Sequence, residues 1–199
     1  MPEQYREGDE IPVRVLRVMD GDSLRVRDIR SRRDLEVRLE GIDAPEIGQR
    51  HSQSSRRYLE RLARGRLVLL VTGVDQYGRV LGVLRKARAD GPSLNRAMVE
   101  AGWAYHYEQY APRARVLRDA QALARRERRG VWAGSDEPMR PWDYRRYRSR
   151  LESRGEWRRF PRRWRGRRRR GGYGLVLRLA LALIVLFTVL RLLGELAGP

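Results

Sequence analysis

Apolar and charged residues alternate along the first forty positions of the chain. Residues 11–18, 24–27 and 35–39 place apolar side chains at about every second position, which is the period of a half-buried β-strand. Asp20-Gly21 separates the first two runs, and an Asp-Gly pair in this setting predicts a tight hairpin turn. The polar residues 28–34 separate the second run from the third. The pattern predicts three consecutive antiparallel strands, as in a small meander or barrel.

Five further elements are predicted in the rest of the domain. They are helices over residues 52–63, 93–101 and 112–129, and strands over residues 67–71 and 80–84. The helices have apolar residues at helical spacing, and each is closed by a glycine shortly after its last turn. A tight turn at residues 75–79 joins the two strands into a hairpin. Five strands and about three helices within residues 8–135 predict a mainly β fold with α-helices, an OB-fold five-stranded barrel with helical additions.

The charge of the chain narrows the class of partner. There are 44 lysines and arginines against 25 acidic residues, which gives a formal net charge of +19, and Lys86 is the single lysine. A balance this basic favours nucleic acid or an anionic membrane surface. The absence of cysteine excludes disulfides, thiolate catalysis and cysteine-based zinc sites. The two histidines, His51 and His106, are far apart and lack metal-ligand spacing, so a surface or pocket-rim position is expected for both.

Acidic residues cluster at both ends of the stretch over residues 18–46. Folding the two ends of this stretch back on each other brings Asp22, Asp43 and Glu46 towards one point, with Arg38 beside them. Carboxylates bind hard divalent cations, and a guanidinium binds phosphate through a two-pronged contact. The cluster therefore predicts a site for a phosphodiester, whereas the simpler alternative is a set of solvated turn residues.

Several motifs occur in an order and spacing that resemble the staphylococcal-nuclease-like (thermonuclease) family. They are Asp20-Gly21-Asp22-Ser23, residues 38–46 (RLEGIDAPE), residues 75–79 (DQYGR), residues 94–104 (LNRAMVEAGWA) and residues 129–132 (RGVW). The resemblance extends from about residue 11 to residue 132. It implies an OB-fold enzyme that uses a calcium ion to hydrolyse DNA and RNA phosphodiesters.

The resemblance also assigns roles to individual residues. Asp22 and Asp43 match the side chains that bind the metal, Ala44 matches a position that gives its backbone carbonyl, and Asp20 acts through water or a neighbouring ligand. Glu46 matches the residue that engages the attacking water, and Arg38 and Arg79 match the two arginines that hold the scissile phosphate. Tyr77 matches a tyrosine of the nucleotide pocket. The family has further pocket tyrosines near Tyr105, Tyr107 and Tyr110, and the spacing leaves open which of the three applies.

The composition changes after the domain. Residues 136–173 are rich in arginine and aromatic residues, with fifteen arginines between residues 140 and 170, and predict a flexible basic linker. Its arginines and aromatic rings suit nucleic acid, and they equally suit anionic membrane lipid. Residues 174–193 are almost wholly apolar and predict a transmembrane helix, followed by a short tail over residues 194–199. The linker charge keeps the domain on the cytoplasmic side, and the polar N-terminus predicts no signal peptide.

The sequence thus predicts a membrane-tethered, calcium-dependent nuclease with little sequence preference. The preference between DNA and RNA and the oligomeric state stay open. Two alternatives remain: a non-catalytic nucleic-acid-binding module anchored at the membrane, and a scaffold whose basic tail binds lipid.

Overall fold

The structure is a computed structural model that describes residues 5–88, 91–135 and 138–154. The predicted transmembrane segment 174–193, the tail 194–199 and most of the predicted linker lie outside these residues. In the part of the chain that is described, no helix has both the length and the apolar character needed to cross a membrane.

Five strands form a closed barrel in the order β1-β2-β3-β6-β5. They are β1 (Glu10–Val18), β2 (Ser23–Asp28), β3 (Asp34–Leu39), β5 (Leu67–Val74) and β6 (Val80–Lys86). All neighbouring strands are antiparallel except β3 and β6, which run parallel and close the barrel. Two short strands, β4 (Ile42–Asp43) and β7 (Tyr105–His106), pair separately beside it. The predicted five-stranded barrel with helices, consistent with an OB-fold, is confirmed.

The alternating pattern explains the core of the barrel. Along β2 and β3 the apolar residues Leu24, Val26, Val37 and Leu39 are buried, whereas the charged residues between them face outward or towards the barrel rim. Strand β5 contributes the buried Leu67, Leu69 and Val71 from its apolar run. Period-two burial in each strand therefore fills the barrel interior with branched side chains.

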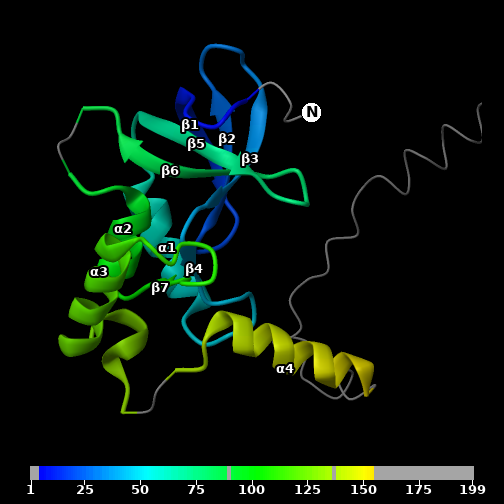
Figure 1. The fold of residues 1–199 in the computed structure, drawn as a ribbon, viewed down its shortest axis with the longest axis vertical. Helices are drawn as coiled ribbons and strands as arrows, with labels where there is room; N and C mark the ends of the chain where they lie inside the picture. The colour runs from blue at the N-terminus through cyan, green and yellow to red at the C-terminus, as the bar shows by residue number, and fades with distance from the viewer. Residues whose placement is uncertain (1–4, 89–90, 136–137, 155–199) are drawn as a thin grey trace, which may run out of the picture. The chain divides into compact units, whose positions relative to one another are not determined.

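The helices gather at one end of the barrel (Figure 1). They are α1 (Ser52–Leu62), α2 (Leu94–Glu100), α3 (Arg115–Arg126) and α4 (Pro141–Ser153), with a short 3-10 helix over Gly130–Ala133. Asn95 joins α2 to the seam of the barrel: its side chain accepts a hydrogen bond from Leu84 N and donates to the carbonyls of Glu40 and Gly82. This buried amide adds hydrogen bonds to backbone groups at the seam between β3 and β6.

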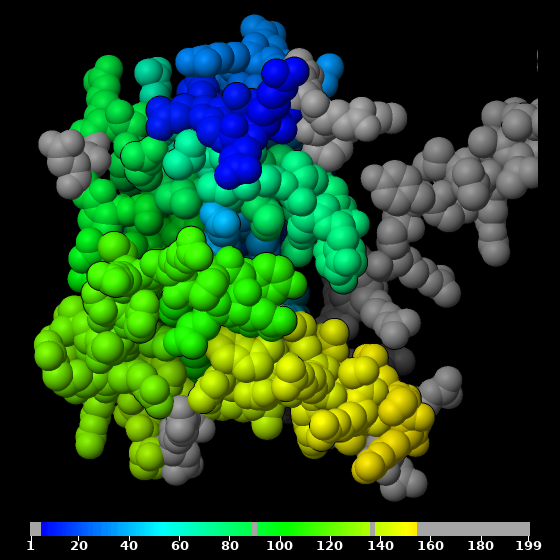
Figure 2. All heavy atoms as spheres, viewed as in Figure 1, coloured from blue at the N-terminus to red at the C-terminus, as the bar shows by residue number. Residues whose placement is uncertain are grey.

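Helix α4 is the main departure from the sequence prediction. Part of the segment predicted to be a flexible basic linker forms this helix, which has Pro141 in its first turn and Asp143 near its positive N-terminal end. Trp142 stacks on Tyr107 with ring centroids 5.2 Å apart and meets Tyr105 edge-on at 5.9 Å. In Figure 2 the atoms of α4 pack directly against the green segment that contains β7 and the residues after it.

The prediction for His106 was wrong. His106 lies in β7 and is buried, and its ring Nε2 is 2.9 Å from the carbonyl oxygen of Ala111. Its backbone N–H donates to the side chain of Gln121 from α3. The histidine thus fixes the segment after β7, and a surface position is available only to His51, which is partly exposed at the start of α1.

Candidate active site

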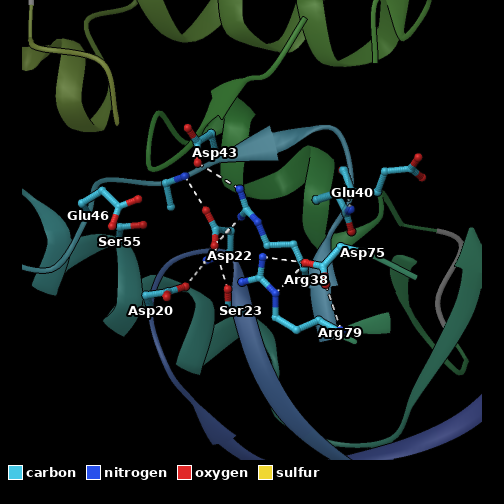
Figure 3. A network of polar contacts seen from close by, with 12 residues as sticks. Asp20, Asp22, Ser23, Arg38, Glu40, Asp43, Glu46, Ser55, Asp75 and Arg79 are labelled. Carbon is cyan, nitrogen blue, oxygen red and sulfur yellow. Dashed lines mark hydrogen bonds and ion pairs between the residues drawn. The ribbon is translucent and has the colours of Figure 1, made fainter. Parts of the chain in front are cut away.

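The barrel topology places the predicted acidic and basic residues at one point. Strand pairing sets Arg38 of β3 opposite Ser23 at the start of β2, so Arg38 lies beside Asp22. Asp43 in β4 pairs with Tyr105 in β7, and Glu46 follows in the loop after β4. Figure 3 shows these side chains converging between β2, β3 and β4.

Two buried carboxylates share one guanidinium. Arg38 Nη1 contacts Asp22 Oδ1, and its Nη2 lies 2.9 Å from Asp43 Oδ1. Asp22 and Asp43 are 6% and 1% exposed. The second oxygen of Asp22 accepts a 2.6 Å hydrogen bond from the backbone N–H of Ala44. Burial of two charges at this depth requires such partners, because an unpaired buried carboxylate is costly.

The turn before β2 is pressed against α1. A Cβ atom at Gly21 would overlap the Oγ atom of Ser55 and the Cβ atom of Ala44. Only glycine leaves room for this approach, which fixes the backbone between Asp20 and Asp22. The Asp-Gly pair predicted from sequence as a turn thus also sets the depth at which the Asp22 carboxylate lies.

Asp20 and Asp22 have opposite electrostatic environments. Burial alone would raise the pKa of Asp22, but the Arg38 guanidinium and the hydrogen bonds from Asp20 and Ala44 lower it below its ordinary value. Burial, together with the adjacent Asp22 carboxylate, raises the pKa of Asp20 to about 8. Asp22 is therefore the charged carboxylate of the pair, and Asp20 stabilises that charge through a hydrogen bond.

The structure adds a residue that the sequence analysis did not single out. Arg145 of α4 donates from Nη1 to Glu46 Oε1 at 2.6 Å and to Asp43 Oδ1 at 3.1 Å, and from Nη2 to Asp43 Oδ2 at 2.8 Å. In the sequence Arg145 is one of fifteen arginines spread over residues 140–170. The available signal was its spacing of three from Trp142, which puts the two on neighbouring positions of one helix face.

Arg79 is held next to the network by its own partner. Its Nε and Nη2 atoms both lie 2.7 Å from Asp75 Oδ2, in the turn between β5 and β6. The Asp75 carboxylate also accepts the backbone N–H groups of Tyr77 and Arg79. Figure 3 shows Arg79 and Asp75 beside Arg38. The predicted Asp22, Arg38, Asp43 and Glu46 are linked by ion pairs, directly or through Arg145. Arg79 lies beside them, and its charge is paired with Asp75.

The four candidate tyrosines differ in exposure. Tyr105 is buried against Trp132 and Trp142. Tyr77 and Tyr110 are 74% and 68% exposed, and the ring of Tyr107 lies between those of Tyr110 and Trp142. Tyr77 also lies beneath the Arg79 guanidinium, 5.5 Å from ring centroid to Cζ. Rings available to a ligand are therefore those of Tyr77, Tyr107 and Tyr110.

The donor chemistry of the network suits a hard divalent cation. Asp22, Asp43 and Glu46 supply only oxygen atoms, and the deep burial of two of them favours a compensating positive charge. Within residues 5–88, 91–135 and 138–154, no three acidic or histidine side chains are arranged as a formed metal cluster. The carboxylates are instead gathered around the guanidinium groups of Arg38 and Arg145.

Comparison with known proteins agrees with this fold. The family described as staphylococcal nuclease homologue matches residues 36–134. The chain therefore belongs to this family of nucleases. It is 40% identical over 137 residues to a protein of Escherichia coli named "Uncharacterized endonuclease", covering 68% of this chain and 86% of that relative. It is 34% identical over 140 residues to a protein of Shigella flexneri named "Micrococcal nuclease", covering 66% of this chain and 79% of the relative.

Proposed function

We propose that the chain is a calcium-dependent endonuclease that hydrolyses phosphodiester bonds of DNA or RNA. The observation that carries the proposal is the convergence of three carboxylates and the Arg38 guanidinium at one point on the barrel. The relatives named as nucleases, of which the chain covers most of the length, support the same reading.

In this proposal the cation is held by Asp22, Asp43 and the backbone carbonyl of Ala44. A bound divalent cation supplies neutralisation of the phosphate charge and polarisation of its oxygens. Arg38 exchanges part of its contact with the carboxylates for phosphate oxygens and stabilises the charge that develops on them. Arg79 does the same from the turn between β5 and β6. Glu46 accepts the proton of the attacking water, since it is the least buried carboxylate of the three.

We assign the exposed rings of Tyr77 and Tyr110, and the half-buried ring of Tyr107 next to Tyr110, to the bases of the substrate. A base stacks on an aromatic face with little preference for sequence. This assignment agrees with the weak sequence specificity expected from a site whose charged groups face only the phosphate.

The direct test is cleavage of supercoiled plasmid and of single-stranded RNA by the purified full-length chain. Cleavage is expected with calcium and lost in excess chelator, because the site offers only carboxylate and carbonyl oxygen to a cation and no histidine or thiolate. Rates with calcium, magnesium and manganese identify the metal. Full activity in chelator would refute the metal dependence, and binding without cleavage under every condition would favour the non-catalytic binding module.

We further propose that residues 174–193 anchor the enzyme in a membrane with the nuclease domain on the cytoplasmic side. The apolar length of the segment and the arginines that precede it support this arrangement. The full-length chain is expected in the membrane fraction after washes with high salt and with alkaline carbonate, and a chain without residues 175–199 in the soluble fraction. Release by salt alone would mean that the arginines hold the protein on the surface. Digestion of the domain by protease added outside intact cells would overturn its orientation.

A further inference from the structure

The geometry points to Arg145 as a built-in competitor of the catalytic cation, which rests on the metal-dependent function proposed above. Helix α4 places the Arg145 guanidinium on Asp43 and Glu46. We propose that a divalent cation binds only by displacing this guanidinium, so that α4 sets the cation concentration at which the nuclease becomes active.

The contacts leave little of Asp43 for a cation. Arg145 takes Asp43 Oδ2 at 2.8 Å, and Asp43 Oδ1 is shared between Arg145 Nη1 at 3.1 Å and Arg38 Nη2 at 2.9 Å. Both oxygens of the proposed ligand therefore already accept charged hydrogen bonds. A calcium ion must come within about 2.3–2.6 Å of such an oxygen. A guanidinium and a cation, both positive, do not share the same carboxylate face at these distances.

Arg145 engages Glu46 as well. The 2.6 Å contact between Arg145 Nη1 and Glu46 Oε1 is the shortest that this guanidinium makes. A carboxylate oxygen held in a charged hydrogen bond is not free to accept one from a water molecule. One side chain thus blocks a metal ligand and the group that would activate water.

Helix α4 is positioned for this role by packing on the side of the site. Trp142, three residues before Arg145, stacks on Tyr107 and meets Tyr105. The side chain of Gln49, in the loop that also contains Glu46, donates to the carbonyl of Met139 just before the helix. These contacts fix the helix beside the carboxylates at both Trp142 and Met139.

The neighbouring arginines of α4 do not share this position. Arg148 faces Glu152 of its own helix at 3.9 Å, and the side chain of Arg146 makes no ion pair or hydrogen bond within the described residues. Helix α4 also follows residue 134, the last residue of the family match. The contact with the site is therefore specific to Arg145 and comes from a segment attached to the family domain.

A purely structural ion pair makes a different prediction from a competitor. If Arg145 only stabilised the fold, its loss would leave calcium affinity unchanged. If it competes with the cation, its loss leaves the buried Asp43 with one positive partner fewer and raises the affinity of the site for calcium. A rise in calcium affinity therefore distinguishes competition from a structural role.

The experiment is calorimetric titration of the full-length protein with calcium chloride in the absence of nucleic acid. Arg145→Gln is expected to lower the calcium Kd about 10- to 100-fold, which is the worth of one charged hydrogen-bonded contact. Arg145→Lys keeps the charge but loses the two-pronged contact, so a smaller decrease is expected. Arg146→Gln removes the same charge from the next position of α4 and is expected to leave the Kd within twofold.

The calcium concentration that gives half-maximal cleavage is expected to fall in parallel with the Kd. A calcium Kd that is unchanged or higher in folded Arg145→Gln and Arg145→Lys would overturn the competition. A lower maximal rate with unchanged calcium affinity would instead make Arg145 a substrate-binding residue, and would also overturn it. The titration contains no nucleic acid, so it tests the competition independently of cleavage. Calcium binding without cleavage of any substrate would refute the proposed nuclease function alone.

Discussion

Replacement of Arg38 or Arg79 by alanine is expected to slow phosphodiester cleavage by about 10²–10³-fold, the usual effect of losing one donor to a developing oxyanion. Arg38 lies between Asp22 and Asp43 with its side chain only 15% exposed, and Arg79 is oriented by Asp75. Lysine at either position is expected to restore part of the rate, because it keeps the charge without the two-pronged geometry. The measurement is single-turnover cleavage at saturating calcium.

The two alanine variants are expected to differ in their free energy of unfolding, because Arg38 and Arg79 lie in different environments. Arg38→Ala leaves Asp22 and Asp43 buried with less positive charge, so the metal-free protein is expected to unfold at lower denaturant concentration, and calcium is expected to restore part of the loss. Arg79→Ala removes a partly exposed pair and is expected to leave the unfolding midpoint nearly unchanged. Arg25→Ala, on the outer face of β2 beside Asp34, is the control and should retain wild-type cleavage. Wild-type rates in both site variants would show that the phosphate is held elsewhere.

Glu46→Gln is expected to lower the maximal rate about 10²–10⁴-fold, the range for removal of a general base. The substitution keeps the size and shape of the side chain and removes its charge and basicity. Substrate binding, measured as the KM, is expected to change little, because Arg38 and Arg79 carry the phosphate contacts.

Glu36→Gln is the matched control for this substitution, since Glu36 lies exposed on β3 and the chemical change is the same. Its maximal rate should equal that of the wild type. An unchanged maximal rate in Glu46→Gln would remove Glu46 from the mechanism and direct attention to another proton acceptor.

The barrel and the centre of the site follow from local sequence patterns. Alternation fixed which residues of β2 and β3 face inward, and the polar turn between them sets the register in which Ser23 pairs with Arg38. That register is sufficient to place Asp22 against Arg38. The position of Arg79 also follows from the sequence, because the tight turn over residues 75–79 brings its two ends, Asp75 and Arg79, close together.

Tertiary contacts decide the features that the sequence pattern missed. The apolar pattern of residues 141–153 is weak, so no periodicity identifies α4, and the helix is positioned by the stacking of Trp142 on Tyr107. The selection of Arg145 among many arginines depends on that packing. His106 is buried because Ala111 and Gln121 offer it polar partners. No sequence motif links His106 to either of them.

The parallel pairing of β3 with β6 ties the completion of the active site to the order in which the chain is made. Arg38 pairs with Leu81 across this seam, and Arg79 lies two residues before Leu81. The carboxylates Asp22 and Asp43 leave the ribosome well before β6 does, and the contact across the seam is long-range, hence slow to form. A nascent chain therefore carries the acidic half of the site without the second arginine. The two arginines of the candidate site therefore come together only when β6 closes the barrel against β3.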